Sequence, residues 1–586
     1  MFSFGPTKAN KKRPDWIIIV NHNECSCLKL VAQKLSPKIR SFLKTNPDAK
    51  NIEITIGECV VQRDLISSLF FGKEIQFSRS NIDLLLKLST ALDISELYHG
   101  LLNYQAYINN IENTINASPE ISELLRIENL IFLLSTSNFE NILQKTLKLI
   151  SPQNEDVFAR TFLSYCVARY NKIEILIEFL VLLNQKQNEM QNKQNLSNNN
   201  TVKKFCDLVL KEFFKEINQS GSQRYDEYRS ILQELCFIIY QLIEKNLLDQ
   251  NEILKNKNVT LPLYFAHLMT PDQIQRAQRV NSFNNEDKYP AFAQIVKSTD
   301  PKQWIPVHRY NAHIGMNTTP INYAIRFDRI DDLMKYIKSP QFKNDGKVMS
   351  CMYERCSFVN EKPKFVEYAA FFGSVECFKY FISNGDDKVS GIFRYAICSG
   401  NPDIIKICSD LKSTLLGTLS LSIEYHHQVI SEWLVDVKNQ ICDQISIQNC
   451  FRFCSFEMFI YMLKKGVNAN YFLLEATHYD NLLAVLFLLQ IKGINVNLQD
   501  SRKGLAPLHY ACQNRNLNIV RLLVNMNSIQ INCRTIPNNI FLILEFNFVF
   551  LYNSNFNLLI KEKVELHHFI LHVKMMILKL LNYFCK

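Results

Sequence analysis

Few residues in this chain of 586 amino acids have the type and spacing needed for chemistry. His22, Cys25 and Cys27 are grouped closely enough to suggest metal ligands, because zinc prefers imidazole and thiolate groups. Their spacing matches no standard zinc pattern, and no second Cys/His pair follows at a suitable distance. Two further cysteine pairs also lack neighbouring histidines: Cys351 with Cys356, and Cys450 with Cys454. The sequence therefore predicts no metal site and no cofactor.

Enzymatic motifs are also missing from the sequence. It contains no glycine-rich phosphate loop, no Gly-x-Ser-x-Gly elbow and no His-Glu-x-x-His pattern. Acidic residues are dispersed, and 15 glycines leave little room for loop-built active sites. We therefore predict a protein that is not an enzyme. A catalytic cluster assembled from distant positions remains an alternative, because a linear sequence does not reveal it.

Composition favours a cytoplasmic protein, with a nuclear location left open. The net charge of +10 is spread along the chain, and its only tight basic run, residues 8–13, lies in a leader at residues 1–14. We interpret that run as a solvated tail and expect no nucleic-acid partner. The opening residues lack the apolar core of a secretory signal, so the 17 cysteines are interpreted as reduced side chains, many of them buried.

The most regular segment of the chain is residues 504–524. Pro507 suits the first turn of a helix, small Ala511 allows a neighbouring helix to approach closely, and residues 517–523 are apolar at helical spacing. The unit resembles an ankyrin repeat, and the positions that carry the resemblance are Pro507, Leu508, His509 and Ala511. One such unit cannot bury its own apolar face, so neighbouring repeats are expected. The resemblance implies structural hydrogen bonds for His509.

Earlier copies of the same pattern are more degenerate. They centre on small residues: Ala324, Ala369, Ala396 and Ala476, with weaker candidates at residues 422–434 and 450–463. We predict an ankyrin-type α-solenoid over residues 318–534, clearest at 471–534. A generic helical domain with chance periodicity is the alternative for the middle copies.

The first hundred residues alternate between strand-like and helix-like patterns. Residues 16–20 are β-branched and predict a strand, residues 27–31 its partner, and residues 51–56 a half-buried strand. Ser36-Pro37 begins a helix, and an apolar helix, a Gly turn, a short strand and two more helices follow over residues 65–97. This order resembles the BTB/POZ fold, which predicts a small α/β domain at residues 15–105. An unrelated small α+β domain is the alternative.

Residues 118–300 show helical apolar spacing, interrupted by a Gln/Asn-rich tract at 185–200 that we predict to be a linker or an exposed loop. These helices are either further repeats or a spacer packed on the first domain. The predicted fold class is thus mainly α, with a small α/β domain, helical segments and a solenoid.

The two resemblances imply two functions. Ankyrin arrays bind other proteins along a surface made by hairpin fingers and inner helices, so we expect a scaffold that binds partner proteins. The BTB/POZ resemblance implies self-association and, as the alternative function, a substrate adaptor of a cullin-type ubiquitin ligase. The candidate protein-binding residues are Asn497, Gln499, Asp500, Arg502, Lys503, Tyr510, Gln513 and Asn514.

The segment at residues 535–586 breaks the repeat pattern. Its apolar run at 541–552 is interrupted by Glu545 and Asn547 and is short for a bilayer, so no membrane partner is expected. Residues 567–584 can be reverse-translated and read in a shifted frame, in which each new codon takes the third base of one codon and the first two bases of the next. The shifted frame permits Pro-Leu-His-Phe-Ala-Cys-Glu-Asn-Asp-Asp-Ile-Glu-Ile-Val-Glu-Leu-Leu. That string resembles another ankyrin repeat. We hypothesise that the tail from about Thr535 is translated out of frame.

Sequencing the transcript across the codons for residues 530–586 tests this hypothesis. We expect a retained intron, a missed base or a frameshift site near the codon of Thr535. An uninterrupted message, together with a tail peptide found by mass spectrometry and no frameshift product, would contradict it.

Overall fold

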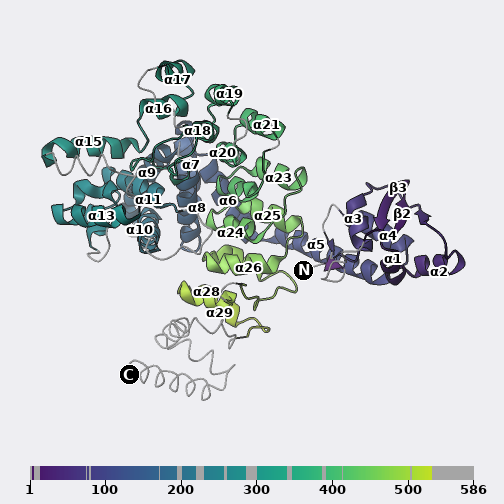
Figure 1. The fold of residues 1–586 in the computed structure, drawn as a ribbon. Helices are drawn as coiled ribbons and strands as arrows, with labels where there is room; N and C mark the ends of the chain where they lie inside the picture. The colour runs from purple at the N-terminus through teal and green to yellow at the C-terminus, as the bar shows by residue number, and fades with distance from the viewer. Residues whose placement is uncertain are drawn as a thin grey trace, which may run out of the picture. The chain divides into compact units, whose positions relative to one another are not determined.

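The computed structural model describes most of the chain: residues 3–4, 13–73, 75–77, 81–169, 172–194, 201–219, 230–255, 261–284, 300–338, 346–385, 391–411, 413–501 and 504–530. These residues are mainly helical, with a small three-stranded sheet near the amino terminus, which confirms the predicted fold class (Figure 1). They divide into two compact units, one formed by Met1–Ile121 with Leu463–Lys586 and the other by Ser122–Met462. The predicted tail at 535–586 and most of the basic leader lie outside the described residues.

The three-stranded sheet consists of β2 (Trp16–Val20), β3 (Asn23–Cys27) and β4 (Asn51–Ile54) in the order β3-β2-β4. β2 pairs with β3 antiparallel and with β4 parallel. A second pair of short strands, β1 (Ser3–Phe4) and β5 (Ile75–Gln76), is antiparallel. Trp16, Ile18 and Val20 face the core at alternate positions, as the period of a half-buried strand requires.

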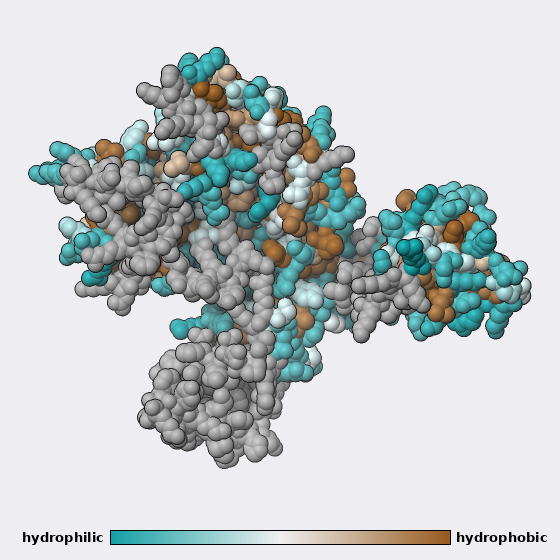
Figure 2. Space-filling model, viewed as in Figure 1, coloured by the Kyte–Doolittle hydropathy of each residue, from teal (hydrophilic) through white to brown (hydrophobic). Residues whose placement is uncertain are grey.

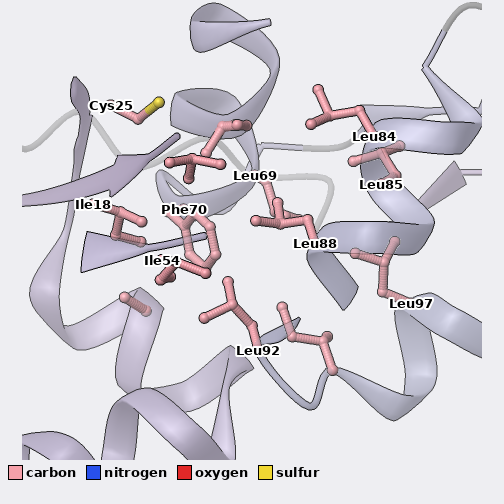
Figure 3. Close-up of a cluster of buried hydrophobic side chains, with 14 of the residues drawn as sticks. Ile18, Cys25, Ile54, Leu69, Phe70, Leu84, Leu85, Leu88, Leu92 and Leu97 are labelled. Carbon is pink, nitrogen blue, oxygen red and sulfur yellow. The ribbon is translucent and has the colours of Figure 1, made fainter. Parts of the chain in front are cut away.

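Five helices accompany this sheet: α1 (Lys29–Leu35), α2 (Pro37–Thr45), α3 (Arg63–Phe70), α4 (Ile82–Ala91) and α5 (Ser95–Ala117). The Ser36 side chain caps α2 by accepting a hydrogen bond from the Ile39 N–H at 3.1 Å. The core brings together side chains from the sheet, α3, α4 and the start of α5 (Figure 3). Ile18 and Phe70 are fully buried in it.

The predicted partner strand at residues 27–31 is wrong. The partner is β3, which ends at Cys27, and residues from Lys29 onward form α1. Asn21 and His22 adopt φ values of 46° and 64°, so a tight two-residue turn returns the chain directly to β2. The apolar residues after Cys27 then have helical spacing, with Leu28 and Ala32 buried four positions apart.

The unit Ser122–Met462 begins with a helical middle. Its elements are α6 (Pro119–Phe132), η1 (Thr136–Asn138), α7 (Phe139–Leu149), α8 (Glu155–Ala168), α9 (Ile173–Gln194), α10 (Thr201–Gln219), α11 (Leu232–Glu244), α12 (Gln250–Leu254), η2 (Leu263–Leu268), α13 (Pro271–Asn284) and α15 (Pro301–Ile314). The predicted loop at 185–200 is wrong in its first half, because residues up to Gln194 continue α9. Gln, Lys, Glu and Met are good helix formers, so a polar composition does not end a helix. Residues 195–200 lie outside the described residues.

Seven helix pairs follow along the chain. They are α16 (Pro320–Arg326) with α17 (Ile330–Ile337), α18 (Phe365–Phe372) with α19 (Val375–Ser383), α20 (Ile392–Ser399) with α21 (Pro402–Asp410), α22 (Thr418–Glu424) with α23 (Gln428–Asp436), α24 (Gln444–Arg452) with α25 (Phe456–Lys464), α26 (Ala469–His478) with α27 (Leu482–Leu488), and α28 (Pro507–Gln513) with α29 (Leu517–Val524). Within Ser122–Met462 the first helices α16, α18, α20, α22 and α24 pack in succession, and α17, α19 and α21 form a second row (Figure 1). This is the arrangement of a solenoid.

The connection from α17 to α18 includes η3 (Ser357–Val359) and is longer than the connections between later pairs of this unit. Glu354 in this connection pairs with Arg326 on α16 at 2.9 Å, and both side chains are buried. The Ser357 hydroxyl donates to the Ser230 carbonyl at 2.7 Å, just before α11. The connection therefore bonds the helical middle to the first helix pairs.

In the other unit, α5 contacts the segment that begins α26. The Ala469 N–H donates to the Tyr107 hydroxyl at 3.0 Å, and the Tyr104 hydroxyl donates to the Lys465 carbonyl at 3.4 Å. A Cβ at Gly466, where φ is 88°, would lie 2.0 Å from the Tyr104 hydroxyl. Glycine adopts this backbone conformation without strain, and any side chain here would clash with Tyr104.

Candidate protein-binding surface of the helix pairs

One turn geometry joins the two helices of every pair. A residue in the left-handed conformation, with φ between 51° and 72°, follows the first helix: Asp328, Gly373, Gly400, His426, Cys454, Asp480 and Arg515 in chain order. Four positions earlier lies a small residue that is at most 1% exposed: Ala324, Ala369, Ala396, Ser422, Cys450, Ala476 and Ala511. In all pairs but the one at Ala396, the small residue's carbonyl accepts a hydrogen bond, at 2.8–3.1 Å, from the residue after the left-handed one. This is a Schellman-type helix end.

The last described pair, α28 with α29, contains the clearest motif of the sequence. Pro507 occupies the first turn of α28, where its missing N–H costs no hydrogen bond. His509 Nδ1 accepts the Ala506 N–H at 3.0 Å, which closes the start of the helix. Ala511 is fully buried, and Leu508 is nearly so. The structure thus places these four motif residues in the frame of the pair.

The polar side chains of Asn497, Gln499 and Asp500, in the hairpin before α28, make hydrogen bonds within the protein. Asp500 Oδ2 accepts hydrogen bonds from the Leu505 N–H at 2.9 Å and the Tyr510 hydroxyl at 3.1 Å. Gln499 donates to the Gly504 carbonyl at 2.8 Å. Asn497 donates to the Ser528 carbonyl at 2.7 Å and accepts the Gln530 N–H at 2.8 Å. Three of the predicted binding residues therefore hold the hairpin and the segment after α29.

The predicted residues on α28 divide into two kinds. Tyr510 is buried, and its ring stacks on His478 with centroids 4.5 Å apart, while burial and nearby Asp500 raise the pKa of its hydroxyl. Asn514 donates to the Thr477 and His478 carbonyls at 2.9 and 3.0 Å and so joins this pair to the preceding one. Gln513 is half-exposed. Arg502 and Lys503 lie outside the described residues.

A more exposed apolar surface lies at the loops on either side of α22 and α23. Leu416 and Ile441 are 84% and 80% exposed. Gln440 bonds the two loops, because its amide donates to the Leu415 carbonyl at 2.7 Å and accepts the Leu419 N–H at 3.2 Å. Val437, at the end of α23 and in the same loop as Ile441, is 61% exposed, and we call Leu416, Val437 and Ile441 the finger patch. Sequence reasoning missed it, since only the hydrogen bonds of Gln440 place the two loops side by side.

The residues considered for chemistry have structural surroundings. His22 is exposed and lies 3.1 Å from Glu53, while Cys25 and Cys27 are buried in the sheet. Burial raises the pKa of the Cys27 thiol to about 12, which disfavours the thiolate that binds metals. Cys450 and Cys454 are buried too, with raised pKa values for the same reason. No group of three potential metal ligands occurs within the described residues.

The described helices also bear on membrane association. Among them, no helix is both long enough and apolar enough to cross a bilayer.

Comparison with known families identifies part of the solenoid. The family model for ankyrin repeats matches residues 445–535 with three copies. These copies cover α24 with α25, α26 with α27, and α28 with α29. A search of curated proteins found no match. Ankyrin repeats are protein-interaction modules, so the matched region has a role in protein–protein interaction.

Asn514→Ala should destabilise the junction between the last two described pairs, and Gln513→Ala should not. Asn514→Ala removes two hydrogen bonds to backbone carbonyls, which corresponds to about 1–2 kcal/mol. Gln513→Ala removes no hydrogen bond that the described residues show, and we expect a change within about 0.5 kcal/mol. Thermal unfolding of both full-length variants, monitored by circular dichroism, measures the difference. Equal melting temperatures would contradict the assigned role of Asn514.

Proposed function

We propose that this chain is a non-enzymatic scaffold that binds partner proteins at the finger patch of its helix pairs. The observation that carries the proposal is the exposure of Leu416 and Ile441 on loops cross-linked by Gln440. Large apolar side chains held on a rigid frame lose little conformational entropy when a partner covers them. Several apolar patches are visible among the hydrophilic surface of the molecule (Figure 2).

The proposal extends the ankyrin assignment upstream of residue 445. The pairs from α16 to α23 repeat the small residue and the left-handed turn of the matched pairs, at Ala324, Ala369, Ala396 and Ser422. That shared geometry supports ankyrin-type repeats throughout residues 318–534. The array supplies the binding surface, and partner identity depends on its exposed loop residues.

A double substitution, Leu416→Asp with Ile441→Asp, should abolish partner capture without unfolding the chain. Two carboxylates in the centre of an apolar interface would be buried without partners, and we expect at least a tenfold loss of bound protein. Val429→Asp is the matched control, since Val429 is 79% exposed on α23 outside the patch. Affinity purification of the tagged full-length chains from the native cell, with quantitative mass spectrometry, measures the loss. Equal capture by all variants would place the interface elsewhere.

A second candidate function is a substrate adaptor of a cullin-type ubiquitin ligase. The order of elements in residues 16–117 supports it: two antiparallel strands, two helices, a strand parallel to the first, a helix, a short strand and two more helices. That order is similar to the BTB/POZ fold. On α5, Tyr98 and Leu102 are four residues apart and 37% and 39% exposed. They offer an apolar contact on the surface that follows residues 86–97, and the same domain would support self-association.

Tyr98→Asp with Leu102→Asp distinguishes the adaptor from the scaffold. If the chain is an adaptor, the double variant should lose a bound cullin and keep its other partners. Leu30→Asp, at a residue 57% exposed on α1, is the control within the same domain. Absence of a cullin from the wild-type capture would eliminate the adaptor function and leave the scaffold intact.

A further inference from the structure

A buried polar cluster fastens the helical middle to the turns of two helix pairs. Glu128 on α6 accepts, through Oε2, the N–H groups of Phe456 and Glu457, both at 2.9 Å. These N–H groups belong to the first turn of α25, which has no earlier turn to bond them. A carboxyl group from another part of the chain therefore caps α25, and α6 cannot move away without exposing these N–H groups.

His426, the left-handed residue between α22 and α23, is the second contact. Its Nε2 lies 3.0 Å from the Ser164 hydroxyl on α8, and its ring stacks on Tyr165 with centroids 4.0 Å apart. Arg169, which follows α8, donates to the His426 carbonyl at 3.1 Å. The Ser164 hydroxyl also donates to the Phe453 carbonyl in the next turn along the array. Helix α8 thus bonds to two consecutive turns.

Ser164, His426 and Glu128 are arranged as serine, histidine and carboxylate are in a hydrolase triad, but they are not accessible to a substrate. Ser164, His426 and Glu128 are 5%, 6% and 5% exposed, so no substrate reaches the hydroxyl. The hydroxyl proton is directed to the Phe453 carbonyl and not to the imidazole. These residues fasten helices to one another, and the arrangement is no nucleophile site.

Hydrogen-bond geometry fixes where the protons of this cluster lie. Because the Ser164 proton goes to the Phe453 carbonyl, His426 Nε2 must be the donor to Ser164, and Nδ1 carries a bare lone pair. That Nδ1 has no hydrogen bond within the described residues and lies 3.7 Å from Glu128 Oε1, the carboxyl oxygen that the two N–H groups leave free. One proton on Oε1 leaves both groups uncharged, whereas losing it would leave a carboxylate in the core and gaining a second would add a positive charge there.

The pKa shifts agree with this arrangement. Burial raises the pKa of Glu128 to about 8 and lowers the pKa of His426 well below its ordinary value. The other titratable or charged groups that face the pair from the elements packed against it are Tyr165, Arg169, His427, Cys450, Cys454 and Glu457.

We propose that Glu128, His426 and Ser164 form a one-proton latch that holds α6 and α8 on the turns at His426 and Cys454, and that opens when the pair loses its proton or gains a second one. The latch is independent of the partner that the scaffold binds. It makes the attachment of the helical middle to the array sensitive to pH.

The sign of the pH dependence follows from the protons in each state. In the open state, where α6 and α8 have left the turns, the two groups have their ordinary pKa values of 4.5 for Glu128 and 6.5 for His426. Between these pH values the open state carries one proton, on His426, and the closed state also carries one, on Glu128. The opening equilibrium is therefore independent of pH in this range. Above 6.5 the open state has none, so opening increases until the pH passes the closed-state pKa of about 8. Below 4.5 the open state binds two protons, and opening increases again.

Hydrogen exchange of the intact chain tests the latch. The readout is the exchange of the Phe456 and Glu457 amides, corrected for intrinsic rates and followed from pH 5.5 to 8.5. We expect the opening equilibrium of the wild type to be flat at first and then to rise by roughly tenfold per pH unit between 6.5 and 8. Glu128→Gln should remove the rise, because an amide still accepts both N–H groups and directs its own N–H at His426 without titrating.

Glu178→Gln on α9 is the matched control, since Glu178 is exposed and belongs to the same unit. It should retain the wild-type pH profile. Glu128→Ala should increase exchange at these amides at all pH values while circular dichroism remains that of a folded chain. A flat wild-type profile, or the same rise in Glu128→Gln as in the wild type, would overturn the proposal. Unchanged exchange in a folded Glu128→Ala variant would overturn it as well.

Discussion

The left-handed turn after a small buried residue is the constraint on which the helix pairs depend. The second helix must run back beside the first after only two or three residues, and a single residue with positive φ makes this possible. Only Gly373 and Gly400 adopt this conformation without strain, whereas His426, Cys454 and Arg515 each hold it at a cost of about 1 kcal/mol or more. The surrounding packing must supply that free energy. The turns with a non-glycine residue at this position therefore depend on the packing of the neighbouring pairs.

The small residue four positions earlier makes the stacking possible. Its buried side chain lets first helices approach, and its carbonyl accepts the hydrogen bond that ends the helix. The small residue and the left-handed residue are only four positions apart, so the sequence pattern predicts the turn wherever the small residue is alanine, as at Ala369 or Ala511. Where serine or cysteine replaces alanine, as at Ser422 and Cys450, the sequence signal weakens while the geometry is retained. The pairs were predictable from sequence to the extent that alanine and glycine mark them.

The candidate binding residues were less predictable, for a different physical reason. Asn497, Asp500 and Asn514 have the polar character expected of a binding surface, but their hydrogen-bonding groups are satisfied by nearby backbone. A sequence shows which polar atoms a segment carries and not which of them the fold already uses. The same limit applies to Glu128 and His426, since the hydrogen bonds of their cluster join residues 257 to 329 positions apart. No local pattern marks such a pair. The early error at residues 27–31 has a third origin, because one tight turn at Asn21 and His22 decides whether apolar residues continue a strand or begin a helix.

Within Ser122–Met462, the turns at one end of the helix pairs and the loops at the other end make different contacts. The turns at His426 and Cys454 bond to α6 and α8, so backbone groups of both turns find their hydrogen-bond partners inside the molecule. The loops at Leu416 and Ile441 end in exposed apolar side chains, and their own backbone is fixed by Gln440. A partner that covered the loops would displace water from apolar surface and break none of these hydrogen bonds. A partner at the turns would have to replace every bond to α6 and α8. A buried polar group left without its hydrogen bond costs more free energy than a typical interface contact contributes. The free energy of binding therefore favours the loops.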